Sequence, residues 1–237
     1  MRLYAKDIAK MIDLSCVRIW SNRADIEEMV AATRAYRFGQ VSVLQCYIPY
    51  TRKLLADSEI RVVGNVSFPS GSDSTSVKVF QAREMVNAGC DEIDMVMNIG
   101  RLKSGEIAEV EADVRAVARV VHPLPLKVII EIMYLTMEET KDACRICVDS
   151  GATFVKTGTG WADRGTTLED VKLVRSFVHD SIRIKASGGI RNLETLLEMH
   201  HAGASRFGVN LKSGIQIVKE AAAIADGIEV SNQNTGA

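Results

Sequence analysis

Residues 87–93 read Asn-Ala-Gly-Cys-Asp-Glu-Ile, and the same pattern returns as Asp-Ser-Gly-Ala-Thr-Phe-Val at 149–155 and His-Ala-Gly-Ala-Ser-Arg-Phe at 201–207. In each stretch a helical pattern ends at a glycine, the usual left-handed helix cap, and a strand pattern follows at once. Together with Gly39, these cap glycines are 50, 62 and 52 residues apart, about two strand-and-helix units each time. The spacing therefore predicts a regular winding of βα units.

The rest of the chain continues this alternation of short β-branched runs with longer amphipathic stretches, such as residues 77–88. Eight units in 237 residues predict an α/β fold, a single-domain (β/α)8 TIM barrel over residues 1–225. An open doubly wound sheet is the alternative, but the first strand and helix carry no G-x-G-x-x-G motif. Residues 226–237 lose periodicity and end polar, which predicts a frayed tail. The predicted strands lie near residues 12–17, 41–46, 61–67, 92–97, 126–132, 153–157, 182–187 and 205–209.

The charge balance argues against a polyanionic partner. Lys and Arg number 29 against 30 Asp and Glu, which gives a net charge of −1 without a long run of one sign. Nucleic acid is therefore not an expected partner. No segment approaches the about 20 apolar residues that span a bilayer, and charges interrupt the N-terminal ten residues, unlike a signal peptide. We expect no membrane contact and a cytoplasmic location.

The five cysteines are an odd number scattered through apolar segments, which indicates reduced thiols rather than a disulfide framework. Cys144 and Cys147 form a C-x-x-C without a second pair, so buried small side chains are favoured over a redox or zinc role. The four histidines show neither H-x-x-x-H nor H-E-x-x-H spacing. The sequence therefore predicts no metal site.

Charged residues interrupt three predicted strands. In a barrel, alternate strand residues face the outer helices and the interior, and catalytic groups project near the C-terminal ends of the strands. The residues that alternate with Asp94, Lys156 and Lys185 are mostly apolar and are expected to face the outer helices. These three charged side chains should therefore turn inward. One acid and two lysines are thus expected to share the barrel mouth.

Two ammonium groups in one confined site repel each other, so one of these lysines should lose its proton at a lower pH than usual. A neutral buried amine attacks a carbonyl to form a Schiff base, and the protonated imine withdraws electrons from a neighbouring carbon–carbon bond. The trio therefore fits an imine-forming lyase. A structural ion network that closes the barrel is the alternative explanation of the same residues.

Six blocks of sequence carry motifs of one enzyme family, including Phe-Val-Lys-Thr-Gly-Thr-Gly at 154–160 and Lys-Ala-Ser-Gly-Gly-Ile-Arg at 185–191. The others lie at residues 68–71, 77–84, 91–100 and 127–131. In their order and spacing they resemble deoxyribose-phosphate aldolase, a class I, Schiff-base aldolase, over about residues 12–218. The resemblance implies a TIM barrel that cleaves or forms 2-deoxy-D-ribose 5-phosphate, with glyceraldehyde 3-phosphate and acetaldehyde as the other reactants. It also implies no metal, no cofactor and a homo-oligomer.

By this resemblance Lys156 is the Schiff-base nucleophile, Lys185 lowers the pKa of that amine and helps relay protons, and Asp94 activates a proton-shuttling water. Asp13 is implied to hold the second lysine. Phosphate is implied to lie at the loops after strands seven and eight and at the N-terminus of a short extra helix. The residues expected to bind the sugar or its phosphate are Asp13, Ser15, Cys46, Thr157, Thr159, Gly160, Ser187, Gly188, Gly189, Gly208, Asn210, Lys212 and Ser213.

Departures from the family pattern gather at the substrate end. Residues 208–214 are two residues longer than the family's G-T-S-S-G, and Lys212 would hold a phosphate as a point charge or bind a carboxylate. Gly158 removes a hydroxyl beside the nucleophile, and Trp161 either narrows the pocket or packs under a loop. Residues 46–49, matched to C-V-N-P, carry isoleucine where the family has asparagine.

These departures keep two other hypotheses open. The first is a class I aldolase of the same family that acts on a different phosphorylated or acidic sugar. The second is a non-catalytic barrel that binds a sugar phosphate as a sensor, although the lysine pair argues against it.

Overall fold

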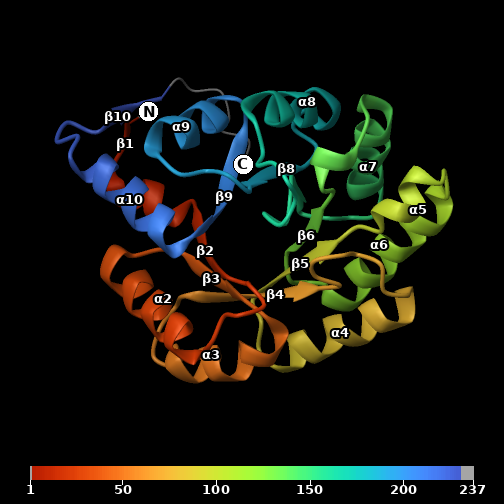
Figure 1. Ribbon diagram of the computed structural model, residues 1–237, viewed down its shortest axis with the longest axis horizontal. Helices are drawn as coiled ribbons and strands as arrows, with labels where there is room; N and C mark the ends of the chain where they lie inside the picture. The colour runs from red at the N-terminus through yellow and green to blue at the C-terminus, as the bar shows by residue number, and fades with distance from the viewer. Residues whose placement is uncertain (1, 231–237) are drawn as a thin grey trace.

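The computed structural model describes residues 2–230 of the chain. Within these residues eight parallel strands close a barrel in which each strand pairs with the next along the chain and the last pairs with the first. Figure 1 shows the strands at the centre and the helices around them, so the predicted (β/α)8 barrel is confirmed. The barrel strands are β2 (Ile12–Cys16), β3 (Gln40–Val43), β4 (Arg61–Val66), β5 (Glu92–Val96), β6 (Leu126–Ile129), β7 (Phe154–Lys156), β8 (Arg183–Ser187) and β9 (Ala204–Asn210).

Helices alternate with these strands. They are α1 (Ala5–Lys10), α2 (Arg23–Tyr36), α3 (Ile48–Leu54), α4 (Thr75–Asn87), α5 (Ile99–Lys103), α6 (Ile107–Val121), α7 (Met137–Asp149), α8 (Leu168–Val178), α9 (Leu193–His201) and α10 (Leu211–Ala222). Several begin at side-chain caps: Thr136 and Thr167 accept hydrogen bonds from the third amides of α7 and α8. Short polar caps thus set where the outer helices start relative to the strand ends.

The strand expected at residues 41–46 ends earlier than predicted. The observed β3 stops at Val43, and a 3-10 turn, η1 (Gln45–Tyr47), leads into α3. Pro49 suits this first helical turn because its missing N–H would have no partner there. The strand expected at 126–132 likewise stops at Ile129, before a second 3-10 turn, η2 (Ile132–Tyr134).

The two ends of the described chain lie side by side. The strand β1 (Arg2–Leu3) pairs antiparallel with β10 (Ile228–Glu229), beside α10 in Figure 1. Ile228 and Val230 are also buried. This differs from the expectation that all of residues 226–237 are frayed, because a short backbone ladder and two apolar side chains hold 228–230. Residues 231–237 of that predicted tail lie outside the described residues.

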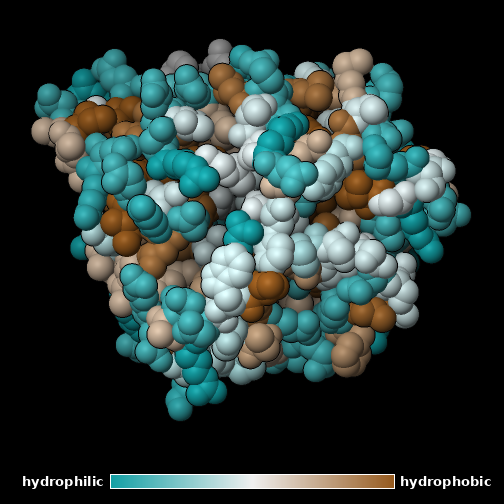
Figure 2. Space-filling view, in the orientation of Figure 1, coloured by the Kyte–Doolittle hydropathy of each residue, from teal (hydrophilic) through white to brown (hydrophobic). Residues whose placement is uncertain are grey.

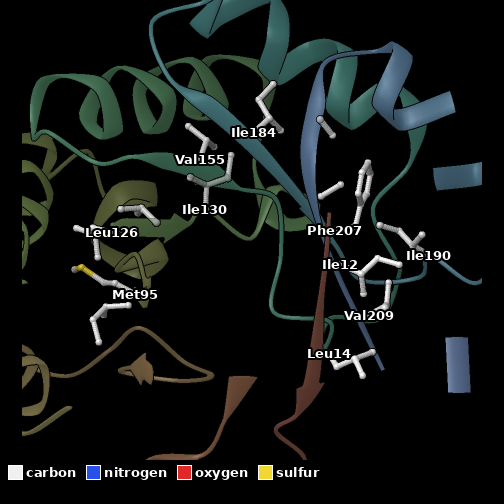
Figure 3. Packing of buried hydrophobic residues seen from close by; sticks show 14 of the residues in the cluster. Ile12, Leu14, Met95, Leu126, Ile130, Val155, Ile184, Ile190, Phe207 and Val209 are labelled. Carbon is white, nitrogen blue, oxygen red and sulfur yellow. The ribbon is translucent and has the colours of Figure 1, made fainter. Parts of the chain in front are cut away.

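Outward-facing strand residues form the core between barrel and helices. Val155 of β7 and Ile184 of β8 are fully buried in this layer, where burial stabilises the fold by about 1.5–3 kcal/mol for each such side chain. The residue that follows each of them, Lys156 or Lys185, faces the opposite way, into the barrel. Figure 3 shows other members of the same layer, including Ile12, Leu14, Met95, Leu126, Phe207 and Val209.

Other features of the sequence also have a place in the fold. Cys144 and Cys147 of α7 are buried in the core, and burial raises the pKa of both thiols, which confirms their interpretation as small core side chains. On the face in Figure 2, hydrophobic residues lie in small groups among hydrophilic ones. Over residues 2–230, no helix has the length and apolar character needed to cross a membrane.

Candidate active site

Asp94 of β5 lies at the centre of a buried group of charges inside the barrel. Its Oδ2 accepts hydrogen bonds from Lys156 Nζ at 2.6 Å and from Lys185 Nζ at 3.0 Å, and its Oδ1 accepts one from Lys127 Nζ at 2.9 Å. Strand register explains the convergence, because Asp94 is opposite Lys127 and Lys156 is opposite Lys185 on neighbouring strands. The structure therefore brings the predicted acid and both predicted lysines together.

Two further acids extend this group. Asp13 Oδ2 is 2.5 Å from Lys185 Nζ, and Asp13 Oδ1 is 3.3 Å from an Arg206 nitrogen. Glu92 Oε2 is 2.5 Å from Lys127 Nζ. Within the described part of the chain, the interior of this charge cluster holds four cations and three acids, namely Lys127, Lys156, Lys185 and Arg206 with Asp13, Glu92 and Asp94. At its edge Glu92 also pairs with Arg61, whose side chain is 44% exposed to solvent.

One surplus cation in a buried site is neutralised when one lysine releases its proton. Burial, followed by the cations Lys185 and Lys127, lowers the pKa of Lys156 from 10.5 to about 8 against the opposing charge of Asp94. Burial also disfavours the charge of Lys185, but Asp13 and Asp94 outweigh it and raise that lysine's pKa. Of the two, Lys156 is therefore the lysine that releases its proton more readily, and Lys185 holds its proton more tightly.

The central carboxyl remains ionised beside these lysines. Burial acts to raise the pKa of Asp94, but the charges of Lys127, Lys156 and Lys185 outweigh burial and hold that pKa well below 3.8. Asp94 is fully buried, whereas the Lys156 side chain keeps 7% of its surface exposed. The carboxylate is thus fixed inside the barrel, and the amine is the group that reaches the opening.

A cavity at the C-terminal ends of the strands opens onto this amine. Lys156 and Lys185 line it together with side chains from β3 and β4, Ser42 and Asn65. Of the residues predicted to bind the sugar, Asp13, Ser15, Thr159, Ser187 and Gly208 also line it. We call this space the amine cavity.

A second cavity adjoins the amine cavity beyond β8 and β9, and Ser15 and Ser187 line both. Its wall includes Arg191 and the start of α10, where Asn210 Oδ1 accepts a hydrogen bond from Ser213 N at 2.9 Å. A helix N-terminus and an arginine both favour an anion. We call this space the anion cavity, and the predicted residues that line it are Ser15, Thr159, Gly160, Ser187, Gly188, Gly189, Gly208, Asn210 and Ser213.

Two glycines form the tight edge of the anion cavity. Gly188 and Gly189 have φ of +100° and +81°, a backbone conformation that residues with a side chain rarely adopt. A Cβ on Gly189 would also lie 3.0 Å from Gly165 Cα, and Gly188 O accepts a hydrogen bond from Thr166 N at 3.0 Å. Glycine at both positions thus lets the main chain line the cavity directly.

Arg18 and Trp161 meet across the mouth of the anion cavity. An Arg18 Nη atom donates to Gly160 O at 3.0 Å, and the guanidinium carbon lies 5.2 Å from the centroid of the Trp161 ring. Trp161 in turn packs edge-on against Phe68, with centroids 6.0 Å apart. The sequence left two roles open for Trp161, narrowing the pocket or packing under a loop. Because Trp161 lines the anion cavity, the structure favours the first.

Comparison with known proteins places the chain in a family. The family model described as DeoC/LacD family aldolase matches residues 11–217. The chain belongs to this aldolase family. A Schiff-base mechanism is general for the family.

Relatives agree with this assignment. A protein of Sinorhizobium medicae named deoxyribose-phosphate aldolase is 41% identical over 94% of this chain and 90% of its own length. A solved aldolase designated QR15 is 38% identical, with a TM-score of 0.85 over 90% of this chain and 95% of its own. A deoxyribose-phosphate aldolase from Aeropyrum pernix, described as tetrameric, is 23% identical with a TM-score of 0.85 over 92% and 93%, and supports the fold.

Three predicted binding residues lie outside both cavities of this aldolase. Cys46 is exposed on η1, because the inward position at the end of β3 is Ser42. Thr157 is buried behind the cavities, where its hydroxyl is 2.7 Å from the Thr166 hydroxyl and accepts from Ser187 N at 3.0 Å. Lys212 lines a neighbouring hollow between α2 and α10, which shares Ser15, Arg18 and Asn210 with the wall of the anion cavity. Thr157 therefore holds strand ends in place.

The predicted phosphate loop at 208–214 also differs from expectation. β9 continues to Asn210 and α10 begins at Leu211, so these residues form a strand end and the first turn of a 12-residue helix.

Gly158, which replaces a residue with a hydroxyl in the family pattern, leaves room for two neighbouring side chains. A Cβ at this position would lie 2.9 Å from Glu131 Oε1 and from Met133 Cε. The Glu131 carboxylate accepts from Thr159 N at 3.0 Å, which fixes the loop after β7.

Sequence reasoning missed several side chains of the site. Lys127 and Glu92 occupy inward positions by the same alternation that identified Asp94, and Arg206 precedes the outward Phe207 on β9. Applied to every strand, that alternation would have found them. Arg18 carries no such signal, because it lies beyond β2 in a loop whose path the sequence does not define.

Proposed function

We propose that this aldolase cleaves and forms 2-deoxy-D-ribose 5-phosphate, with acetaldehyde and glyceraldehyde 3-phosphate as the other reactants. The observation that carries the proposal is the pair of lysines on one carboxylate, with the pKa of Lys156 lowered to about 8 while that of Lys185 is raised. An isolated structural ion network would favour two charged lysines. The family membership and the names of the relatives add independent support.

In the proposed mechanism, the neutral amine of Lys156 attacks C1 of the open-chain sugar. Loss of water from the carbinolamine gives a protonated imine. The C2–C3 bond then breaks: its electron pair passes toward the imine nitrogen to give an enamine, and the C3 hydroxyl releases its proton as glyceraldehyde 3-phosphate forms. Protonation of the enamine at C2 and hydrolysis release acetaldehyde and the free lysine.

The other members of the charge cluster act on this lysine and its protons. Asp94, ionised and hydrogen-bonded to Lys156, accepts and returns protons through a water beside the amine. Lys185, held by Asp13, stays cationic and keeps the pKa of Lys156 low. The phosphate binds in the anion cavity, on the main chain of Gly188 and Gly189 and the start of α10.

A product assay tests the proposal. The purified chain should release acetaldehyde from 2-deoxyribose 5-phosphate, and Lys156→Met should abolish release while leaving the folded structure intact. Preferred turnover of another phosphorylated or acidic sugar would replace the substrate assignment. Binding of deoxyribose phosphate without any turnover would reject the enzyme in favour of a binding protein. The expected homo-oligomer stays a prediction that light scattering can test.

A further inference from the structure

A buried serine and asparagine in the amine cavity have no part in the mechanism above. Ser42 of β3 and Asn65 of β4 are 4% and 6% exposed, and both line the cavity that holds Lys156. Asn65 is opposite Asp94 across β4 and β5, so it lies beside the central carboxylate in the register of the barrel. Ser42 and Asn65 therefore belong to the amine cavity and not to the core between barrel and helices.

Their hydrogen bonds fix the orientation of the Asn65 amide. Its Nδ2 donates to Ser42 Oγ at 2.9 Å and to Val43 O at 2.9 Å. The reversed amide would place Oδ1 against the Val43 carbonyl, two acceptors in contact, so the observed orientation follows from the network. Both N–H donors of the amide are thereby used inside the protein.

This arrangement leaves one buried acceptor in the cavity. Among residues 2–230, Asn65 Oδ1 has no hydrogen-bond partner although it is buried. An unpaired buried carbonyl costs free energy unless a ligand or water pairs with it. Beside it, Ser42 Oγ accepts from Asn65 and keeps its own proton to donate. One acceptor and one donor side by side match a single hydroxyl group, which both donates and accepts.

We propose that Ser42 and Asn65 form a subsite that recognises the non-reacting hydroxyl of the substrate, the one at C4 of deoxyribose phosphate. This inference rests on the proposed function. The sugar must run from Lys156 to the anion cavity, and the amine cavity lies between them. The C3 hydroxyl must give up its proton during cleavage, and an amide oxygen is too weak a base to take it. Asn65 therefore suits the hydroxyl that keeps its proton.

The test uses the synthetic direction, in which the C4 hydroxyl enters on the acceptor aldehyde. Wild-type enzyme and acetaldehyde are combined with either glyceraldehyde 3-phosphate or its deoxy analogue, 3-oxopropyl phosphate. We expect kcat/KM to favour the hydroxylated acceptor by about tenfold or more, since a site built to hydrogen-bond a hydroxyl rejects the analogue that lacks it. Asn65→Leu should bring this ratio close to one, mainly by losing the hydroxylated acceptor.

Two further variants keep the test decisive. Ser42→Ala removes the donor with little change in volume, should lower the ratio several-fold, and decides the matter if Asn65→Leu does not fold. Thr33→Val is the matched control, because Thr33 is also fully buried and its hydroxyl donates to Met29 O, within α2. The control should leave the ratio unchanged. An unchanged ratio in the cavity variants, or an equal loss with both acceptors, would overturn the subsite.

Reductive trapping separates this inference from the function on which it rests. Acetaldehyde and cyanoborohydride should label Lys156 in the wild-type chain and, to the same extent, in Asn65→Leu, because acetaldehyde carries no hydroxyl. If the wild-type chain is not labelled, the proposed function fails. If labelling is normal in both chains and the acceptor ratio does not change, only the hydroxyl subsite fails.

Discussion

Replacing Lys185 by methionine should raise the pKa of Lys156 and move the pH profile of the enzyme. Both amines lie on Asp94 Oδ2, at 2.6 Å and 3.0 Å, so their nitrogens are at most about 5.6 Å apart. At an effective dielectric constant of about 20, two unit charges at that distance repel by about 3 kcal/mol, or about two pKa units. In Lys185→Met, the neutral fraction of Lys156 at pH 7 should therefore fall about 100-fold.

The assay is the pH dependence of imine trapping by acetaldehyde and cyanoborohydride, since it reports the free amine without later steps. In the wild-type chain the trapping rate should rise with pH and level off above about 8, and in Lys185→Met the inflection should move toward 10. Removing Lys185 leaves Asp13 with Arg206 as its remaining ion-pair partner among the described residues. The double variant Asp13→Asn, Lys185→Met restores the charge balance and should show the same shift. An inflection that stays near 8 in both variants would show that Lys185 does not lower the pKa of Lys156.

Three other perturbations test the protonation of Lys156, the anion cavity and Arg18. Because the pKa of Lys156 is about 8 in the folded chain and 10.5 in its ordinary state, the unfolded chain binds more protons between these values. The free energy of unfolding should gain a positive slope with pH in that window, which Lys156→Met removes; equal slopes in urea titrations would contradict this. Gly188→Ala forces a side chain to φ +100°, so the KM for deoxyribose phosphate should rise at least several-fold, whereas turnover of unphosphorylated deoxyribose should change little. Arg18→Ala removes the contact with Gly160 O and Trp161, and should raise the KM about three- to tenfold without moving the urea midpoint; a shifted midpoint would indicate a structural role.

Strand alternation made much of this site predictable. Each strand of a barrel turns every second side chain inward, so a charge such as Asp94 or Lys156 flanked by apolar residues is already assigned to the interior. The glycine caps before β5, β7 and β9 set the repeat that gave the fold. The strand alternation and the glycine caps both follow from local backbone geometry, so they can be read from a short stretch of sequence.

Positions that depend on where a strand stops were harder to predict. Cys46 was matched to a motif, but β3 ends at Val43, so the inward side chain near its end is Ser42. Lys212 is the second residue of α10, and it lines the hollow between α2 and α10 instead of the anion cavity. Loop residues such as Arg18 reach the site through tertiary packing, which one sequence does not encode in any short pattern.

Peptide mapping after reductive trapping identifies the lysine that forms the imine. The chain is incubated with 2-deoxyribose 5-phosphate and cyanoborohydride near pH 8, digested and analysed by mass spectrometry. We predict one modified lysine, Lys156, whose label is lost in Lys156→Met. A label on Lys185, or an active chain that carries no label, would contradict it.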